Sequence, residues 1–284
     1  MPQKKQPPTV RLRRLAAELR RLRAQADLSW EAVHERTAIN KTTLYRIEKA
    51  QARPQKRTLL TLLSLYEAPK DEHDYLVDLL KDASKQGWLQ PYHSDLPEEY
   101  TAYISFENEA ACVRNYEASF IPGLLQGEDY ARAVITGVLP GATDEEIENH
   151  VRARMGRQAV LTKDKPLKFW AVIDEAALHR DVGGPEVMRA QLLSLVKAAK
   201  APNITLQIIP FGAGAHPGMS GQFVRLEFAD AMDTDLIYIE SMAGELFLES
   251  EADISRYRSI FDHLVAMALS PKESVSLLIE EAQG

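Results

Sequence analysis

The stretch SWEAVHERTAINKTTLYRIEK, residues 29–49, decides the fold of the first part of this chain. Its pattern predicts two short helices joined by a tight connection at residues 37–39. Ser29 and Asn40 are suitable N-caps, because a short polar side chain can accept a hydrogen bond from the first turn of a helix. The spacing therefore predicts a compact helix-turn-helix unit, with its second helix beginning after Asn40.

The second of these helices has two different faces. Leu44 and Ile47 are spaced to face a core, while small polar and basic side chains are left outside. Side chains of this kind at the start of a helix are typical of helices that read the major groove of DNA. The candidate DNA-contacting residues on this helix are Asn40, Lys41, Thr42, Thr43, Tyr45 and Arg46.

Helical spacing of apolar residues predicts three further helices around this pair, over residues 12–26, 58–66 and 71–85. Six arginines lie on or directly before the outer face of the first of them, at positions 11, 13, 14, 20, 21 and 23, with Glu18 as their local counter-charge. The positive charges on such a face repel one another unless an anion binds there. We therefore add Arg11 and Arg14 to the candidate DNA-contacting residues.

Charge is divided unevenly along the chain. Residues 1–66 carry 15 Lys and Arg against 5 Asp and Glu, whereas residues 67–284 carry 19 against 36. The net charge of −7 hides this asymmetry. A basic first part predicts double-stranded DNA as a partner. The alternative is a helical protein-interaction module with a solvated basic face.

Length and composition predict a two-domain intracellular protein. At 284 residues, the chain is long enough for two separate cores. Cys112 is its single cysteine, and no apolar run is long enough for a bilayer or a secretory signal, so we expect a cytoplasmic protein without membrane segments. The expected division is a flexible basic arm over 1–10, a helical domain over 11–85, a linker over 86–100 and an α+β domain over 101–284.

The second domain alternates short β-rich runs with helical stretches. We expect strands at 111–118, 167–174, 203–210, 221–228 and 235–241, and helices near 127–138, 143–161, 186–200 and 250–269. Together with the first part, this pattern predicts a multidomain protein, an all-α five-helix domain followed by an α+β domain.

One polar cluster in the second domain is a candidate partner or ligand site. Arg154, Arg157 and Gln158 are spaced to lie on one helical face. They could hold an anionic ligand or an acidic partner. The alternative is a set of structural ion pairs with carboxylates such as Glu117 or Glu175.

Other motifs in the second domain do not predict an enzyme. FGAGAHPGMSG, residues 211–221, has glycines but leads from one strand to another, so no helix N-terminus is present to bind a phosphate. His216 is a candidate ligand-binding residue, or a turn residue hydrogen-bonded to the backbone. Glu175 and His179 are four apart but lack a visible third metal ligand. We therefore expect no catalytic centre, no cofactor and no metal.

Residues 19–66 resemble the Cro/CI-type, or XRE-type, helix-turn-helix domain along its full length. The resemblance implies a five-helix domain whose third helix enters the major groove, with Lys41, Thr42, Thr43 and Arg46 at the matching positions. Trp30 stands where this family usually has a glutamine that contacts phosphate. Ala38 stands at the usual turn glycine.

Five blocks of the second domain resemble WhiJ-like actinobacterial regulators, in the same order. They are IPGLLQGEDYARAVI (121–135), RARMGRQAVL (152–161), DEAALHRDVGGPEVMRAQLLSL (174–195), PNITLQIIPFGAGAHPG (202–218) and FDHLVAMALSPKESVSLL (261–278). The resemblance implies an antitoxin-like transcriptional regulator, acting with a small acidic protein encoded by a neighbouring gene.

Two functional classes therefore stand at this point. The first is a DNA-binding transcriptional regulator whose second domain serves homodimer formation, partner binding or ligand sensing, since helix-turn-helix proteins commonly present two recognition helices to DNA. The second is an enzyme or small-molecule-binding protein that uses the helices of its first domain for docking.

Overall fold

The computed structural model describes residues 9–82, 96–230 and 233–283. The chain divides into two compact units, Met1–Phe106 and Glu107–Gly284. Residues 1–8 of the expected basic arm and 86–95 of the expected linker lie outside the described residues. Each unit is considered by itself.

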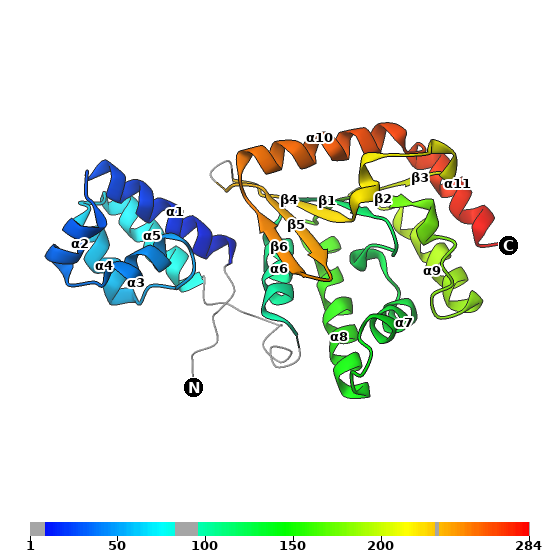
Figure 1. Ribbon diagram of the computed structural model, residues 1–284, viewed down its shortest axis with the longest axis horizontal. Helices are drawn as coiled ribbons and strands as arrows, with labels where there is room; N and C mark the ends of the chain where they lie inside the picture. Colours follow the sequence, from blue (N-terminus) through cyan, green and yellow to red (C-terminus); the bar gives the residue numbers. More distant parts are fainter. Residues whose placement is uncertain (1–8, 83–95, 231–232, 284) are drawn as a thin grey trace. The chain divides into compact units, whose positions relative to one another are not determined.

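The first unit contains the five predicted helices, shown in blue to cyan in Figure 1. Apolar side chains from all five form its core, including Leu15, Leu44, Leu59 and Leu76. The helices are α1 (Val10–Gln25), α2 (Trp30–Thr37), α3 (Lys41–Glu48), α4 (Lys56–Leu65) and α5 (Lys70–Asp82).

Side-chain caps fix where the first three helices begin. Thr9 accepts from the amide of Leu12, Ser29 from that of Ala32, and Asn40 from that of Thr42. The caps predicted at Ser29 and Asn40 are thus confirmed. Each supplies an acceptor to a first-turn amide that has no partner within its own helix.

The second unit is built on a mixed six-stranded sheet in the order β3-β2-β1-β4-β5-β6, as far as the structure describes it. The strands β1, β2 and β3 are parallel, while β4, β5 and β6 continue the sheet in antiparallel fashion. The strands are β1 (Cys112–Glu117), β2 (Lys168–Asp174), β3 (Ile204–Ile209), β4 (Phe223–Glu227), β5 (Leu236–Ser241) and β6 (Gly244–Leu248).

Helices surround this sheet. α10 lies along one side of the sheet, and α7, α8 and α9 lie on the other (Figure 1). Phe261 and Leu264 of α10 pack against Tyr116, Val172 and Phe223 of the sheet. The helices of the second unit are α7 (Glu128–Val138), α8 (Asp144–Arg157), α9 (Pro185–Ala198), α10 (Glu251–Met267) and α11 (Pro271–Glu281), with short 3-10 turns between them. The boundary between the two units, after Phe106, falls within α6 (Glu98–Glu109).

The multidomain fold class is confirmed, and each of the five predicted strands is present. Three elements were not predicted, namely α6, β6 and α11. Two of them have visible local signals: Gly244, at a φ of 122°, begins the strand of a tight hairpin, and Ser270 with Glu273 forms a capping box at the start of α11.

Candidate nucleic-acid interface

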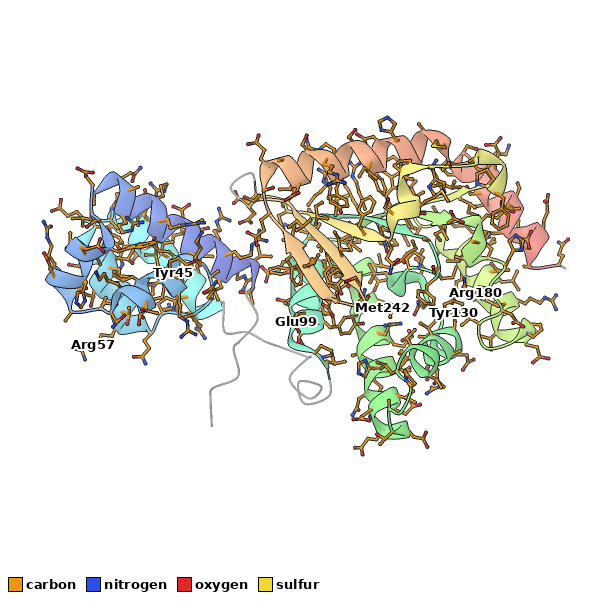
Figure 2. All side chains as sticks on the ribbon, in the orientation of Figure 1. Tyr45, Arg57, Glu99, Tyr130, Arg180 and Met242 are labelled. Carbon is orange, nitrogen blue, oxygen red and sulfur yellow. The ribbon has the colours of Figure 1, made fainter. Side chains whose placement is uncertain are left out.

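The predicted division of α3 into two faces is present in the structure. Leu44 and Ile47 are buried, and they anchor the helix to the core of the first unit. The opposite side is exposed, with Tyr45 as its largest apolar group (Figure 2). The exposed candidates are Asn40, Lys41, Thr42, Thr43, Tyr45 and Arg46.

A buried carboxylate, Glu48, anchors the inner side of α3 to the neighbouring helices. Glu48 is 3% exposed and accepts from Arg23 Nε at 2.7 Å and from Arg23 Nη2 at 2.9 Å. The indole Nε1 of Trp30 also donates to Glu48, at 3.0 Å. These bonds raise the pKa of Arg23, chiefly through the hydrogen bond to Glu48, and they connect α3 to α1 and α2.

Trp30 therefore has a structural role at the position where the resembling family has a phosphate-contacting glutamine. Its N–H is used by Glu48, and its ring meets that of Tyr45 edge-on, with centroids 5.5 Å apart. The side chain of Tyr45 is thereby supported while it stays 40% exposed. Trp30 thus shapes the outer surface of α3 through Tyr45.

The connection between α2 and α3 takes a left-handed turn. Ala38 has a φ of 58°, and its amide donates to the carbonyl of His34. The ring Nδ1 of His34 lies 2.9 Å from the carbonyl oxygen of Ile39. The Cβ of alanine makes this conformation less favourable than it would be for glycine, so Ala38 adopts it at a cost in stability.

The arginines of α1 have more counter-charge than the sequence indicated. Arg21 binds Glu18 and also Glu72 of α5, in each case at 2.7 Å, while Arg23 binds Glu48. Glu18 lies on α1 itself, whereas Glu72 and Glu48 are distant in sequence and are brought to α1 by folding. Two of the six arginines therefore serve the fold of the first unit.

The two α1 candidates, Arg11 and Arg14, are half-buried. The guanidinium of Arg14 lies 5.3 Å from the ring centroid of Tyr75 in α5. Lys41 on α3 forms an exposed pair with Glu31 at 3.2 Å. A pair of that kind is weak and can exchange for a phosphate. Contact of these residues with DNA stays a prediction.

Three exposed cations near α3 were missed in the sequence. Lys49 is the C-cap residue of α3, and Lys56 and Arg57 are the first two residues of α4. Arg57 is labelled in Figure 2. The side chain of Gln55, the N-cap of α4, makes no capping hydrogen bond. Cations beside a helix start with available amides suit an anion. The basic run from Arg53 to Arg57 was the signal that could have identified them.

In the second unit, Arg157 forms a buried ion pair. Its Nε and Nη2 donate to the two carboxylate oxygens of Glu107, each at 2.9 Å, and both side chains are at most 6% exposed. The structure thus shows the ion-pair alternative for this residue, but with Glu107 in place of Glu117 or Glu175. A bidentate pair of this kind is already satisfied and is unsuited to receiving another protein.

Arg154 and Gln158 fasten the loop between β1 and α7. Arg154 Nη1 donates to the side chain of Gln126 at 3.1 Å, and Gln158 donates to the Gln126 carbonyl at 2.7 Å. Gln191 of α9 holds the same loop through Leu125 and Gly127. Arg154, Arg157 and Gln158, which were predicted to share one helical face, thus all bind groups of the protein itself.

Glu117, at the end of β1, lies close to this cluster. Burial raises its pKa to about 7, although a hydrogen bond from Asn115 and the nearby charges of Arg154 and Arg157 act in the opposite direction. The Glu117 carboxyl is therefore a titrating group near neutral pH.

His216 is buried beside the carboxyl end of β2. Its Nε2 lies 3.1 Å from Asp174, its side chain is 5% exposed, and its ring meets that of Tyr116 edge-on. The structure therefore pairs His216 with a carboxylate rather than with the backbone of its own turn. His216 thus contacts the end of β2, whereas Arg154 bonds to Gln126 and Arg157 to Glu107.

The other candidates in the second unit form no metal site. Glu175 and His179 are 3.3 Å apart, and His179 also approaches Glu281 at 3.4 Å. No group of three metal-binding side chains occurs within the described ranges.

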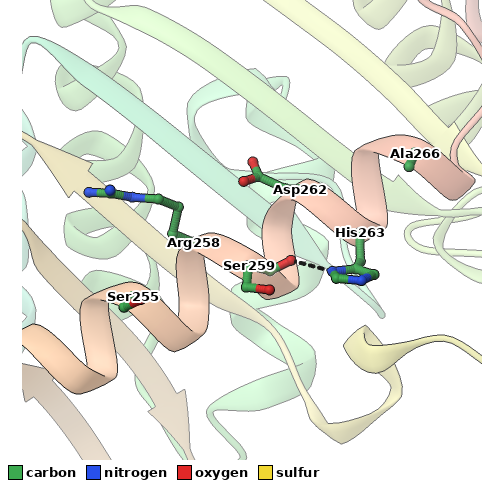
Figure 3. Close-up of a pocket in the computed structure, with 6 residues that line it drawn as sticks. All are labelled: Ser255, Arg258, Ser259, Asp262, His263 and Ala266. Atoms are coloured by element: carbon green, nitrogen blue, oxygen red, sulfur yellow. Dashed lines mark hydrogen bonds between the residues drawn. The ribbon is translucent and has the colours of Figure 1, made fainter.

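One hollow lies on the outer face of α10 (Figure 3). Its lining follows one stripe of the helix and mixes Arg258 with Asp262, so it has no single charge sign. His263 at its edge bonds back to the carbonyl of Ser259 at 2.7 Å. This shallow surface presents no convergent polar groups.

Comparison with protein families assigns both units. Residues 14–76 match a helix-turn-helix domain, and residues 100–280 match the domain of unknown function DUF5753. The second match covers most of the chain, and the chain belongs to the DUF5753 family. The helix-turn-helix domain indicates DNA binding and transcription regulation. No match was found among curated proteins or solved structures.

Within the described residues, no helix is both long and apolar enough to cross a membrane.

Proposed function

We propose that this protein is a sequence-specific DNA-binding transcriptional regulator whose α3 enters the major groove. The observation that carries the proposal is the exposed polar surface of α3 on a helix held rigidly by Leu44, Ile47 and Glu48. A reading helix must present base-contacting side chains from a fixed backbone. We propose that Thr42, Thr43 and Arg46 contact the base edges.

Phosphate contacts would orient the domain on the duplex. The proposed contacts come from Asn40, Lys41, Tyr45, Arg11 and Arg14, together with the exposed cations at the ends of α3 and α4. Contacts to phosphate position a protein without carrying sequence information. The proposal therefore assigns specificity to a few residues and affinity to many.

We further propose that the second unit joins two copies of the chain. A single helix-turn-helix unit buries limited DNA surface, and two recognition helices about one helical turn apart give useful affinity. The resemblance to WhiJ-like regulators supports a further role in binding a small acidic protein. Light scattering of the full chain, alone and with the neighbouring gene's product, tests both roles: a monomer that ignores the partner would contradict them.

The second unit is proposed to act in assembly or sensing and not in catalysis. Arg154, Arg157 and Gln158 are engaged with protein groups, and His216 is paired with Asp174. The four side chains that were candidates for ligand or partner binding are therefore engaged in contacts within the protein.

A mobility-shift titration tests the proposed function. The full chain, incubated with a labelled duplex from its own upstream region, should bind that duplex more tightly than a scrambled one. Affinity should fall as NaCl rises, with the log-log slope steepened by about 0.9 for each phosphate contact. Equal affinity for both duplexes, or binding that ignores salt, would refute a sequence-specific DNA-binding function.

A further inference from the structure

Lysines of the second unit gather at one end of its sheet. Residues 107–284 contain six lysines, and five of them fall within 163–200. They are Lys163, Lys165, Lys168, Lys197 and Lys200, while Lys272 lies elsewhere in the sequence. The two segments that carry the five come from different parts of the fold.

Folding fastens these two segments side by side. β2 begins at Lys168 and runs parallel to β3, so both strands start at the same end of the sheet. Asn203, just before β3, donates to the carbonyls of Leu161 and Leu167 at 3.1 and 2.9 Å. The loop before β2 and the turn after α9 are therefore locked together, and their lysines share one edge.

Four of these lysines, which we term the lysine edge, have no neutralising partner. Lys165, Lys168, Lys197 and Lys200 are exposed, and in the described part of the chain none forms an ion pair or a side-chain hydrogen bond. Lys163 differs, because its Nζ donates to the carbonyl of Asn108 at 2.7 Å.

The lysine edge contrasts with the rest of its unit. Residues 107–284 carry 16 Lys and Arg against 27 Asp and Glu. Several other cations there are paired with carboxylates, as Arg157 with Glu107, Arg225 with Asp235 and Arg132 with Glu128. Single cations without a carboxylate partner among the described residues, such as Arg189 and Lys272, also occur in this unit, but the lysine edge gathers four of them from two segments, and whole-domain charge conceals this cluster.

We propose that the lysine edge binds the phosphate backbone of DNA, as a second contact beside the helix-turn-helix unit. Protein-DNA interfaces are polar and strongly positive, whereas lysine is depleted in protein-protein interfaces. Lysine ammonium groups neutralise phosphates as point charges without needing bidentate geometry. Because both contacts belong to one chain, the second binds at high effective concentration.

This inference rests on the proposed DNA-binding function and assigns it an additional, sequence-independent surface. It predicts that affinity for flanking DNA depends on residues far in sequence from α3. The acidic remainder of the second unit would face away from the duplex, because like charges repel.

The test compares three full-length proteins. The first is wild type, and the second carries K165Q, K168Q, K197Q and K200Q. The third is a matched control that loses four exposed cations elsewhere in the second unit, through R152Q, R189Q, R256Q and K272Q. Circular dichroism and thermal unfolding verify that all three remain folded.

Binding is measured by fluorescence anisotropy on a labelled duplex of arbitrary sequence, several helical turns long. NaCl is varied between about 50 and 200 mM. The lysine-edge variant should bind roughly tenfold or more weakly, and its salt slope should be shallower by about 2 to 4, since each lost phosphate contact removes about 0.9. The control should keep the wild-type slope.

Each other outcome has a distinct meaning. If all three proteins share one slope, the lysine edge does not touch DNA, and the proposed function stands without it. If wild type binds no DNA at low salt, both proposals fall. If the lysine-edge variant keeps its DNA slope but loses affinity for a labelled poly-glutamate peptide, the surface belongs to an acidic polypeptide and the inference is overturned.

Discussion

The indole Nε1 of Trp30 donates to Glu48 at 3.0 Å, which links the start of α2 to the last turn of α3. Glu48 also accepts two hydrogen bonds from Arg23. The buried carboxylate is therefore paired with one cation and accepts three hydrogen bonds in all. This arrangement fixes α3 from its inner side. Its outer side is left free for polar residues that contribute nothing to the core.

The first prediction concerns this buried network. Replacement of Glu48 by Ala should cost about 3 to 5 kcal/mol of unfolding free energy, because it leaves the Arg23 guanidinium without its partner. W30F should cost less, about 1.5 to 3 kcal/mol, since it removes one hydrogen bond to a charged acceptor. Urea unfolding of the full chain, monitored by circular dichroism, measures both. A larger loss for W30F than for E48A would contradict the assignment of Glu48 as the central acceptor.

The second prediction concerns the left-handed turn at Ala38. A38G should stabilise the first unit by about 0.5 to 1 kcal/mol, because glycine adopts a φ near 58° without a Cβ clash. A32G, within α2, is the matched control and should destabilise by about 1 kcal/mol. Thermal unfolding of the two variants compares them directly, and the same sign for both would disprove the strain at Ala38.

The third prediction separates reading from positioning. T42A or T43A should change the preferred DNA sequence, because we propose that these exposed side chains contact base edges. R11Q should weaken binding to all sequences alike, because a phosphate contact carries no sequence information. Selection of bound duplexes from a random library reveals the preference of each variant. Unchanged preferences in both threonine variants would remove these residues from the base-reading set.

The fourth prediction concerns the buried pair in the second unit. R157A should destabilise this unit by about 3 to 5 kcal/mol, because Glu107 would remain charged and buried without its partner. Joint replacement, as E107L with R157M, should cost less than R157A alone. The exposed Arg152 supplies a control, since R152A should change stability by less than about 0.5 kcal/mol. Equal losses for R157A and R152A would rule out a structural role for Arg157.

The fifth prediction is a pH dependence. The folded pKa of Glu117 is about 7, above the ordinary value of 4.5, so the native state holds an extra proton between these values. Stability should therefore decline as pH rises through this window and level off above it. E117Q should abolish the decline and be more stable at pH 8 by up to about 3 kcal/mol. Parallel unfolding curves for wild type and E117Q across pH 5 to 8 would refute this assignment.

Local sequence signals predicted much of the fold. The caps at Ser29 and Asn40 and the apolar spacing of α1 to α5 are short-range features, and each strand that was predicted is present. Elements without a strong local period were missed. The clearest case is α6, whose apolar residues are not confined to one helical face.

Ion-pair partners could not be predicted in the same way. The sequence placed Arg154, Arg157 and Gln158 on one face, yet Glu107 is 50 residues away from its partner Arg157. Likewise, Glu48 reaches Arg23 across 25 residues. Such contacts depend on how helices pack, because side chains far apart along the chain meet only in the folded state.

The sequence by itself determined the two-part organisation, the helix-turn-helix unit and the exposed polar surface of α3, because periodicity, capping and charge are properties of neighbouring residues. Only the tertiary structure decided which charged groups remain available to a partner. It assigned Arg23, Arg157 and His216 to internal contacts, and it brought the unpaired lysines of two distant segments to one edge. Availability depends on long-range pairing and burial, and no local pattern encodes these.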